Sequence, residues 1–318
     1  MDYPIIFIHK GDSFYLKYTF LNAAKYNNVI ILGDDKNKKY MHPNITHYNY
    51  QDILPESTAL RKSFKYIKGD KFDPTNSKID WVYFNFYKWF MLEEFLSYSN
   101  ISKFWIFDSD TLILENLKYQ ISKFSKYDYT THNNNNMFQG LINNRNIINI
   151  FNEYIIKLFN DKVYLKNIKC NFNNNPHHAF TYMKVCKYLN YKLNPNNIRL
   201  NTIINNEIFD ECICFNDGFK KYLLFDRKNG FRKVKKVYFR NNNAYLYNIE
   251  KSKYIKLVSI NLSWVPELFF DKIIKNTTYY NPLFPFIKSY KTLYPYNNIY
   301  DQIKFSINKA KRLVNQFV

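Results

Sequence analysis

The chain has 318 residues, and its 46 Lys and Arg residues against 26 Asp and Glu give a formal net charge of +20. Because 46% of the residues are hydrophobic and 20% are aromatic, the chain can bury a large core, which excludes a disordered or fibrous protein. It contains only six glycines, and neither the dinucleotide-binding nor the P-loop glycine motif occurs. Rossmann dehydrogenases and P-loop ATPases are therefore excluded.

The positive charge is one feature of proteins that bind nucleic acid or anionic membranes. Most of the basic residues here are lysines, whereas proteins that recognise bases favour arginine for its bidentate geometry. Abundant Lys, Asn, Ile and Tyr with little Ala, Gly and Arg fit the codon usage of an AT-rich genome, such as that of a giant virus or a low-GC bacterium. We attribute most of the charge to this coding bias and expect no nucleic-acid partner.

The four cysteines indicate a reducing compartment. Cys170, Cys186, Cys212 and Cys214 form no C-x-x-C pair, and buried reduced thiols explain them best. No apolar run reaches the length of about 18 residues that a membrane-spanning helix needs. The N-terminus also lacks the basic region of a secretory signal. These features predict a cytoplasmic protein, in the host cytoplasm if the gene is viral.

The first 35 residues predict a βαβ unit. Pro4–Ile8 and Val29–Leu32 are short apolar runs typical of buried strands. Between them, apolar residues recur with helical spacing from Phe14 to Ala24, and Ser13 stands at the expected N-cap. A strand, a helix and a strand at this spacing imply a parallel sheet that is covered by helices.

The alternation of predicted strands and helices continues through the middle of the chain. Residues 36–78 are polar and predict irregular structure, an aromatic-rich helix is expected over Ile79–Tyr98, and Lys103–Phe107 is typical of a buried strand. The elements expected next are an apolar run at Leu112–Leu114, a helix near Leu117–Phe124, an Asn-rich loop at 133–136, a strand over Met137–Ile142, helices over Ile147–Phe159 and His177–Leu189, strands near 234–247 and over Tyr254–Ile260, and a helix over Pro266–Ile274. A Pro- and Tyr-rich stretch then leads to a basic amphipathic helix over Asn298–Phe317.

The sharpest motif is an apolar strand that leads directly into Asp108, Ser109 and Asp110. At the carboxyl end of a strand in an open parallel sheet, side chains project into the crevice where ligands bind. Two carboxylates at that place suit Mg²⁺ or Mn²⁺ that is shared with phosphate oxygens. The alternative is an aspartate that only caps the turn after the strand.

Residues 4–114 resemble the nucleotide-sugar half of GT-A glycosyltransferases. The matching positions are the loop after the first strand with His9 and Lys10, the acids after the second strand (Asp34 and Asp35), the helix before the motif with Asn85 and Lys88, and the motif itself with Asp108, Ser109 and Asp110. In this family the D-x-D motif binds a divalent metal that bridges the two phosphates of a UDP- or GDP-sugar. Met137–Asn143, which contains Gln139 and Gly140, resembles the strand whose loop lies beside the sugar.

The resemblance implies a metal-dependent glycosyltransferase of the hexosyltransferase type. Its donor would be a UDP-sugar or, second in preference, a GDP-sugar, and its acceptor a hydroxyl of a glycan, glycolipid or protein. The diphosphate that departs gains negative charge, which Mn²⁺ or Mg²⁺ and nearby cations stabilise. Asp108 and Asp110 would hold the metal, and Lys88 would reach a phosphate unless it is an ordinary lysine on a solvated helix face.

Two sites are candidates for the catalytic base. His177 and His178, at the start of a predicted helix, stand roughly where members of the family place an Asp that faces the acceptor, and a helix N-terminus disfavours the protonated imidazole. Asp217 is the other candidate. The alternatives are capping or surface contacts for the histidines and a turn role before Gly218 for the aspartate.

One departure from the family concerns the metal. Many metal-dependent members supply a late His ligand, but Leu257–Trp264, the matching segment, contains no His. Either Asn261 contributes an oxygen or Asp110 holds the metal without a late ligand.

We expect an α/β protein with a GT-A-like, Rossmann-like and mostly parallel sheet flanked by helices, followed by a helical C-terminal extension. The predicted boundaries are 1–280 for the catalytic domain, with 1–115 as the nucleotide-sugar-binding half and 116–280 as the acceptor half, and 281–318 for the Pro- and Tyr-rich segment with the basic C-terminal helix. This last helix would pack on the domain, mediate dimerisation or rest on an anionic membrane.

Two other functions stay open. Asp108–Leu112 also resembles the nucleophile loop of haloacid-dehalogenase-type phosphatases, in which Asp108 would be phosphorylated. In that family, however, the Thr stands one position later and no complete βαβ unit precedes the motif. A basic, aromatic-rich protein can also bind single-stranded nucleic acid, but most aromatic residues here follow helix or strand periodicity, which favours a place in the core.

Overall fold

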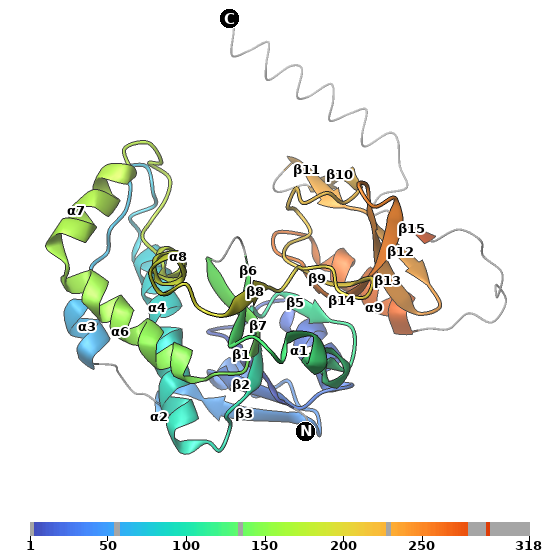
Figure 1. The fold of residues 1–318 in the computed structure, drawn as a ribbon, viewed down its shortest axis with the longest axis horizontal. Coiled ribbons are helices and arrows are strands. Elements are labelled where there is room, and N and C mark those ends of the chain that lie inside the picture. The colour runs from blue at the N-terminus through green and yellow to red at the C-terminus, as the bar shows by residue number, and fades with distance from the viewer. Residues whose placement is uncertain (1–2, 54–57, 133–135, 227–229, 279–290, 293–318) are drawn as a thin grey trace, which may run out of the picture.

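The computed structural model describes residues 3–53, 58–132, 136–226, 230–278 and 291–292. A central sheet lies between a group of helices on one side and a second sheet on the other (Figure 1). The predicted C-terminal helix over Asn298–Phe317 lies outside the described residues. Within the described part, no helix is long and apolar enough to cross a bilayer.

The central sheet has seven strands in the order β3-β2-β1-β4-β7-β6-β8. Its strands are β1 (Ile5–Ile8), β2 (Val29–Gly33), β3 (Ile45–Asn49), β4 (Phe104–Phe107), β6 (Tyr129–His132), β7 (Met137–Ile142) and β8 (Asn197–Arg199). All neighbouring strands pair in parallel except β7, which is antiparallel to both β4 and β6. The α/β fold with a mostly parallel sheet flanked by helices is thus confirmed.

The predicted βαβ unit is present as β1, α1 (Leu16–Ala24) and β2. The predicted N-cap was wrong, because Tyr15 is the N-cap of α1 and Ser13 lies in the turn before it, where its carbonyl accepts a hydrogen bond from Leu16 at 3.1 Å. Residues 36–78, expected to be irregular, contain η1 (Asp35–Asn37), β3, α2 (Tyr50–Ile53) and α3 (Thr58–Ser63). Because β3 is a half-exposed edge strand, it lacks the apolar run that marked β1 and β2.

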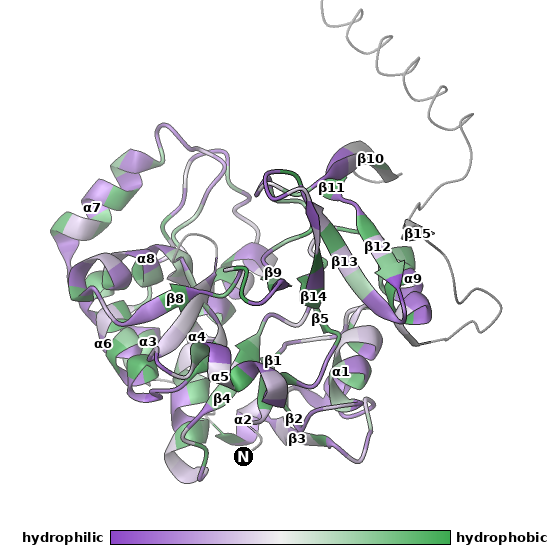
Figure 2. Ribbon diagram, turned by 45° about the vertical axis from the view of Figure 1, so that its right-hand side comes forward, coloured by the Kyte–Doolittle hydropathy of each residue, from purple (hydrophilic) through white to green (hydrophobic). Residues whose placement is uncertain are grey.

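The helical side is formed by α4 (Asn76–Tyr98), α6 (Asn146–Asn160), α7 (Lys162–Asn171) and α8 (Tyr182–Leu193). Aromatic side chains fill the space between them, and Trp89 packs edge-on against both Phe138 and Phe151. Within the described residues, many aromatic side chains lie in the hydrophobic core, as their periodicity predicts. In Figure 2, α7 is mostly hydrophilic, as its place at the edge of the molecule requires.

The second sheet brings late segments of the chain next to the Asp108–Asp110 motif. Its strands are β5 (Thr111–Ile113), β9 (Glu207–Asp210), β12 (Val237–Arg240), β13 (Asn243–Asn248), β14 (Lys253–Asn261) and β15 (Lys291–Thr292), while β10 (Lys221–Asp226) and β11 (Gly230–Lys235) form a separate pair. The short elements η2 (Leu117–Gln120) and α5 (Ile121–Phe124) follow β5, and α9 (Glu267–Thr278) follows β14. Since β14 runs antiparallel to β5 with Asn261 opposite Thr111, the end of β14 lies beside the motif.

Candidate active site

A cavity of about 410 Å³ lies at the ends of β1, β4 and β14. One wall comes from α4 and the start of α8, and the other from the segments that follow β9 and β14. The residues predicted from the sequence that line it are His9, Lys10, Asn85, Lys88, Asp108, Ser109 and Asp110. The carboxyl ends of parallel strands meet at one edge of a sheet, which is why these distant positions converge.

Asp110 is held by two side chains from the end of β14. Asn261 Nδ2 donates to Asp110 Oδ1 at 2.9 Å, and the Ser263 hydroxyl lies 2.7 Å from Asp110 Oδ2. Burial and the nearby charge of Asp108 raise the pKa of Asp110 to about 6, although both hydrogen bonds favour the charged form. The carboxylate is therefore in a place where an additional positive charge would stabilise it.

The orientation of Asn261 follows from its other contacts. Its Oδ1 accepts the backbone N–H of Ser263 at 3.0 Å, and since a backbone N–H can only donate, the amide oxygen must face Ser263. Asn261 thus presents an N–H, not an oxygen, to Asp110. The single proton of the Ser263 hydroxyl is shared between Asp110 and Asn261 Oδ1, which lies 2.6 Å away.

Lys88 lies inside the cavity. Its Nζ is 3.5 Å from Asp108 Oδ1, and its side chain is only 12% exposed. The ammonium group also lies over the Tyr182 ring, 4.6 Å from the ring centroid. The alternative of an ordinary lysine on a solvated helix face therefore does not describe Lys88.

His9 contacts the middle residue of the motif. Its Nδ1 lies 2.8 Å from Ser109 Oγ, and burial lowers the pKa of His9 to about 4, so the imidazole is neutral at pH 7. The loop after β1 is fixed by Asp34, whose Oδ2 accepts the backbone N–H of Gly11 at 2.6 Å. Asp34 supports the cavity from outside its lining.

Three other predicted donor-binding residues lie away from the cavity. Asp35 is exposed and pairs with Lys38 at 2.7 Å. Gln139 and Gly140 are buried in β7, where the Gln139 amide donates to Thr111 Oγ1 at 3.3 Å. Their positions fit a role in supporting the sheet behind the motif.

The three residues predicted as bases do not line the cavity. His177 and His178 are exposed in the turn before Ala179 and not at a helix start as predicted, because α8 begins only at Tyr182. Ala179 instead forms a β-bridge with Lys68, which holds this segment out of the helix. Asp217 forms an ion pair of 2.5 Å with the fully buried Lys235.

The residues at the motif fit a divalent cation that protein side chains bind only in part. Two carboxylates face the same cavity, and the hydrogen-bond partners of Asp110 are neutral. Within the described ranges, no group of three or more His, Cys, Asp or Glu side chains could hold a metal by itself. Mg²⁺ and Mn²⁺ accept such an arrangement because waters and substrate phosphates complete their coordination.

Sequence reasoning missed several residues of this cavity, among them His132, Glu211, Trp81 and Trp264. His132 ends β6, and burial lowers its pKa to about 4; Glu211 follows β9, is buried and lies 3.3 Å from Arg199. Trp81 and Trp264 are 52% and 65% exposed, whereas Trp89 and Trp105 are almost fully buried. The signal available for Glu211 was the acidic pair that it forms with Asp210 directly after the apolar pair Ile208 and Phe209.

No protein-family model matches the chain, and neither does any curated protein. Mouse xyloside xylosyltransferase 1 in its apo form aligns with a TM-score of 0.42 and 7% identity, over 65% of this chain and 88% of that one. The apo-form glycosyltransferase GlyE of Streptococcus pneumoniae TIGR4 aligns with a TM-score of 0.29 and 10% identity, over 62% of this chain and 45% of that one. The PaToxG glycosyltransferase aligns with a TM-score of 0.32 and 14% identity, over 61% of this chain and 70% of that one. All three TM-scores are below 0.5 and all three identities are below 25%.

Proposed function

We propose that this chain is a metal-dependent glycosyltransferase that moves a sugar from a UDP-sugar or GDP-sugar to a hydroxyl of a glycan, glycolipid or protein. The observation that carries the proposal is the convergence of Asp108, Asp110 and Lys88 in one cavity at the carboxyl end of β4. Two acids with a lysine between the sheet and a helix suit a metal-bound diphosphate.

Asp108 and Asp110 would hold Mn²⁺ or Mg²⁺, which when bound supplies Lewis-acid stabilisation of the diphosphate leaving group. Lys88 and Lys10 would contact phosphate oxygens, since both line the cavity. The neutral His9, fixed by Ser109, would offer a hydrogen bond without adding a charge. Asn261 and Ser263 keep the Asp110 carboxylate in its position.

In the transfer, the bond between the anomeric carbon and the phosphate oxygen breaks and its electron pair stays on the diphosphate. The acceptor oxygen forms the new bond to the anomeric carbon, and its proton passes to a base. We assign this role to His132 or Glu211, which both line the cavity. His132 is neutral at pH 7 because its pKa is lowered.

Two exposed tryptophans at the cavity fit the acceptor. Trp81 lies on α4 and Trp264 follows β14, so the two indoles come from opposite walls. Trp264 also has φ of +64°, a backbone conformation that is unfavourable for a bulky residue. Strain of this kind is retained at functional sites, and an exposed indole can stack on the apolar face of a sugar ring.

The test is hydrolysis of a panel of UDP- and GDP-sugars with Mn²⁺ by the wild type and by Asp110→Asn. We expect the wild type to hydrolyse at least one donor and the variant to lose at least 100-fold in rate, in the range of losses for a group that stabilises developing charge. Asp52→Asn, an exposed acid on α2, serves as the matched control with an unchanged rate. Equal rates for the wild type and Asp110→Asn would overturn the proposal, as would release of phosphate from p-nitrophenyl phosphate that depends on Asp108.

A further inference from the structure

Asp110 directly precedes β5, and a second pocket lies at the opposite end of this strand. It has a volume of about 680 Å³ and is formed by the segment after β5, by η2 and α5, by the start of β9 and by the middle of β14. Lys256 in this pocket precedes Asn261 by five residues of β14, which corresponds to about 17 Å along an extended strand. The second pocket is therefore separate from the candidate active site.

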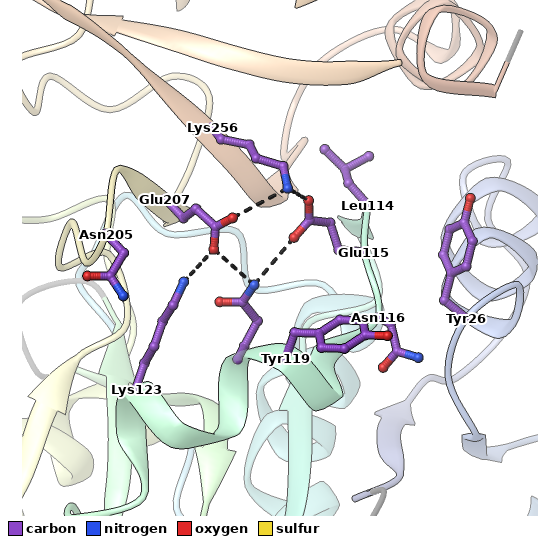
Figure 3. Close-up of a pocket in the computed structure, with 10 residues that line it drawn as sticks. Tyr26, Leu114, Glu115, Asn116, Tyr119, Lys123, Asn205, Glu207 and Lys256 are labelled. Carbon is purple, nitrogen blue, oxygen red and sulfur yellow. Dashed lines mark hydrogen bonds and ion pairs between the residues drawn. The ribbon is translucent and has the colours of Figure 1, made fainter. Parts of the chain in front are cut away.

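Four charged side chains that line the second pocket form one network (Figure 3). Lys256 contacts both Glu115 and Glu207, and Glu207 also pairs with Lys123. Gln120 donates to Glu115 at 3.3 Å and to Glu207 at 3.1 Å. The network thus ties β9, β14 and η2 together and fixes each of these side chains.

The network is electrically balanced, since two lysines face two glutamates. Both lysines are already paired, so the pocket offers little attraction for a phosphate or another anion. The carboxylates, the amides of Asn116 and Asn205, and the ammonium groups still present acceptors and donors side by side. Groups that donate and accept at the same time, such as the hydroxyls of a sugar, match this mixture.

Tyrosine rings complete the second pocket. Tyr119 on η2 is 75% exposed and Tyr26, which follows α1, is 51% exposed. Figure 3 shows both rings on the same side of the charged network. An aromatic face carries partial negative charge and attracts the weakly positive C–H bonds on one face of a pyranose ring. Aromatic rings beside paired acids and amides are therefore suited to a neutral saccharide.

The second pocket is also rigid before any ligand binds. Asn205 and Asn206 have φ of +54° and +60°, and the backbones of Ile204 and Glu207 exchange two hydrogen bonds across them. This is a type I′ turn, which fixes Asn205 at the edge of the pocket. Lys123 and Glu115 are only 11% and 17% exposed, so little side-chain freedom is left to lose on binding.

We propose that the second pocket binds a neutral oligosaccharide by stacking on Tyr119 and by hydrogen bonds to the network of Glu115, Glu207 and Lys256. This proposal goes beyond the proposed function, because binding here requires neither the metal nor a sugar donor. A chain held at this place would remain attached to the protein while another part of it reaches, or leaves, the candidate active site.

The experiment is an array of neutral oligosaccharides, comprising glucan, xylan, galactan, mannan and N-acetylhexosamine fragments, followed by calorimetry on the best ligand with the full chain and with no metal or donor present. We expect Tyr119→Ala to weaken binding at least tenfold and Tyr119→Phe to retain it, since stacking needs the ring and not the hydroxyl. Tyr191→Ala, on an exposed tyrosine of α8, is the matched control.

The variant Asp110→Asn tests whether the second pocket binds the oligosaccharide independently of the candidate active site. It should bind the oligosaccharide as the wild type does, whether or not the chain transfers sugars. The proposal is overturned if no neutral oligosaccharide binds, if Tyr119→Ala binds as tightly as the wild type, or if Asp110→Asn abolishes binding. It is also overturned if sulfated oligosaccharides bind more tightly than their neutral counterparts, because the site would then recognise anions.

Discussion

The left-handed backbone conformation of Trp264 predicts that two substitutions of this residue differ in their effect on stability but not in their effect on acceptor binding. At φ of +64°, a residue with a Cβ costs about 1 to 2 kcal/mol more than glycine. The indole is 65% exposed and recovers little of this by burial. The Arg232 guanidinium donates a hydrogen bond of 2.7 Å to the Trp264 carbonyl, and because it uses only the backbone of Trp264, this bond survives substitution of the indole.

Replacing Trp264 by Gly and by Ala removes the same indole, but only the Gly variant removes the strain. We expect the free energy of unfolding of Trp264→Gly to exceed that of Trp264→Ala by about 1 kcal/mol. The assay is urea denaturation without ligands, together with KM for the acceptor and donor hydrolysis without acceptor. Both variants should raise KM for the acceptor while leaving donor hydrolysis unchanged.

Equal stability of the two Trp264 variants would refute the assignment of backbone strain. An unchanged KM for the acceptor in both variants would refute the role of the indole. The two readouts are independent, so either half of the reasoning can fail without the other.

Three further predictions concern buried groups. The pKa of His132 falls from 6.5 to about 4 on folding, so the unfolded chain binds more protons than the folded one between these values and stability falls as the pH falls. His9 contributes in the same window, so we expect urea denaturation to show a loss that is smaller by about 3 kcal/mol in His132→Gln than in the wild type. The same pH profile for the wild type and His132→Gln would contradict this. In Gly140→Ala, the new Cβ would lie 2.4 Å from Thr130 Oγ1, at a residue whose φ is +94°. We therefore expect calorimetric unfolding to show that the free energy of unfolding falls by more than about 2 kcal/mol. A melting curve like that of the wild type would argue against this. Lys235→Met leaves the buried Asp210 and the partly buried Asp217 without their cation and should lose about 3 to 5 kcal/mol at pH 7. The loss should be smaller at pH 5, whereas a loss independent of pH would point to packing.

Apolar strands were predictable because each forms a continuous hydrophobic run, as in β1 and β4. Strand β6 was missed because it reads Tyr-Thr-Thr-His, although all four residues are buried. Thr130 satisfies its hydroxyl inside the sheet by donating to the carbonyl of Gln139 at 2.5 Å. A buried polar strand of this kind depends on its neighbours and leaves no hydrophobic pattern in the sequence.

The candidate site likewise contains residues that the sequence predicts and residues that it does not. The positions of His9, Lys88 and the D-x-D motif were predictable because they follow, or face, the ends of strands in a parallel sheet. Asn261, Ser263 and Trp264 reach the cavity only through the pairing of β14 with β5. Such a long-range register is set by the folded chain as a whole, and no local pattern encodes it.

The pairing of β14 with β5 also governs when the site can assemble. The residues that hold Asp110 follow it by 151 and 153 positions, so at about 5 to 20 residues per second a ribosome adds them many seconds after the motif itself. Until then, Asp110 lacks both of its hydrogen-bond donors. A nascent chain that ends before residue 261 therefore carries the complete motif without the partners that position it, and Asp110 is held in place only once β14 has been synthesised.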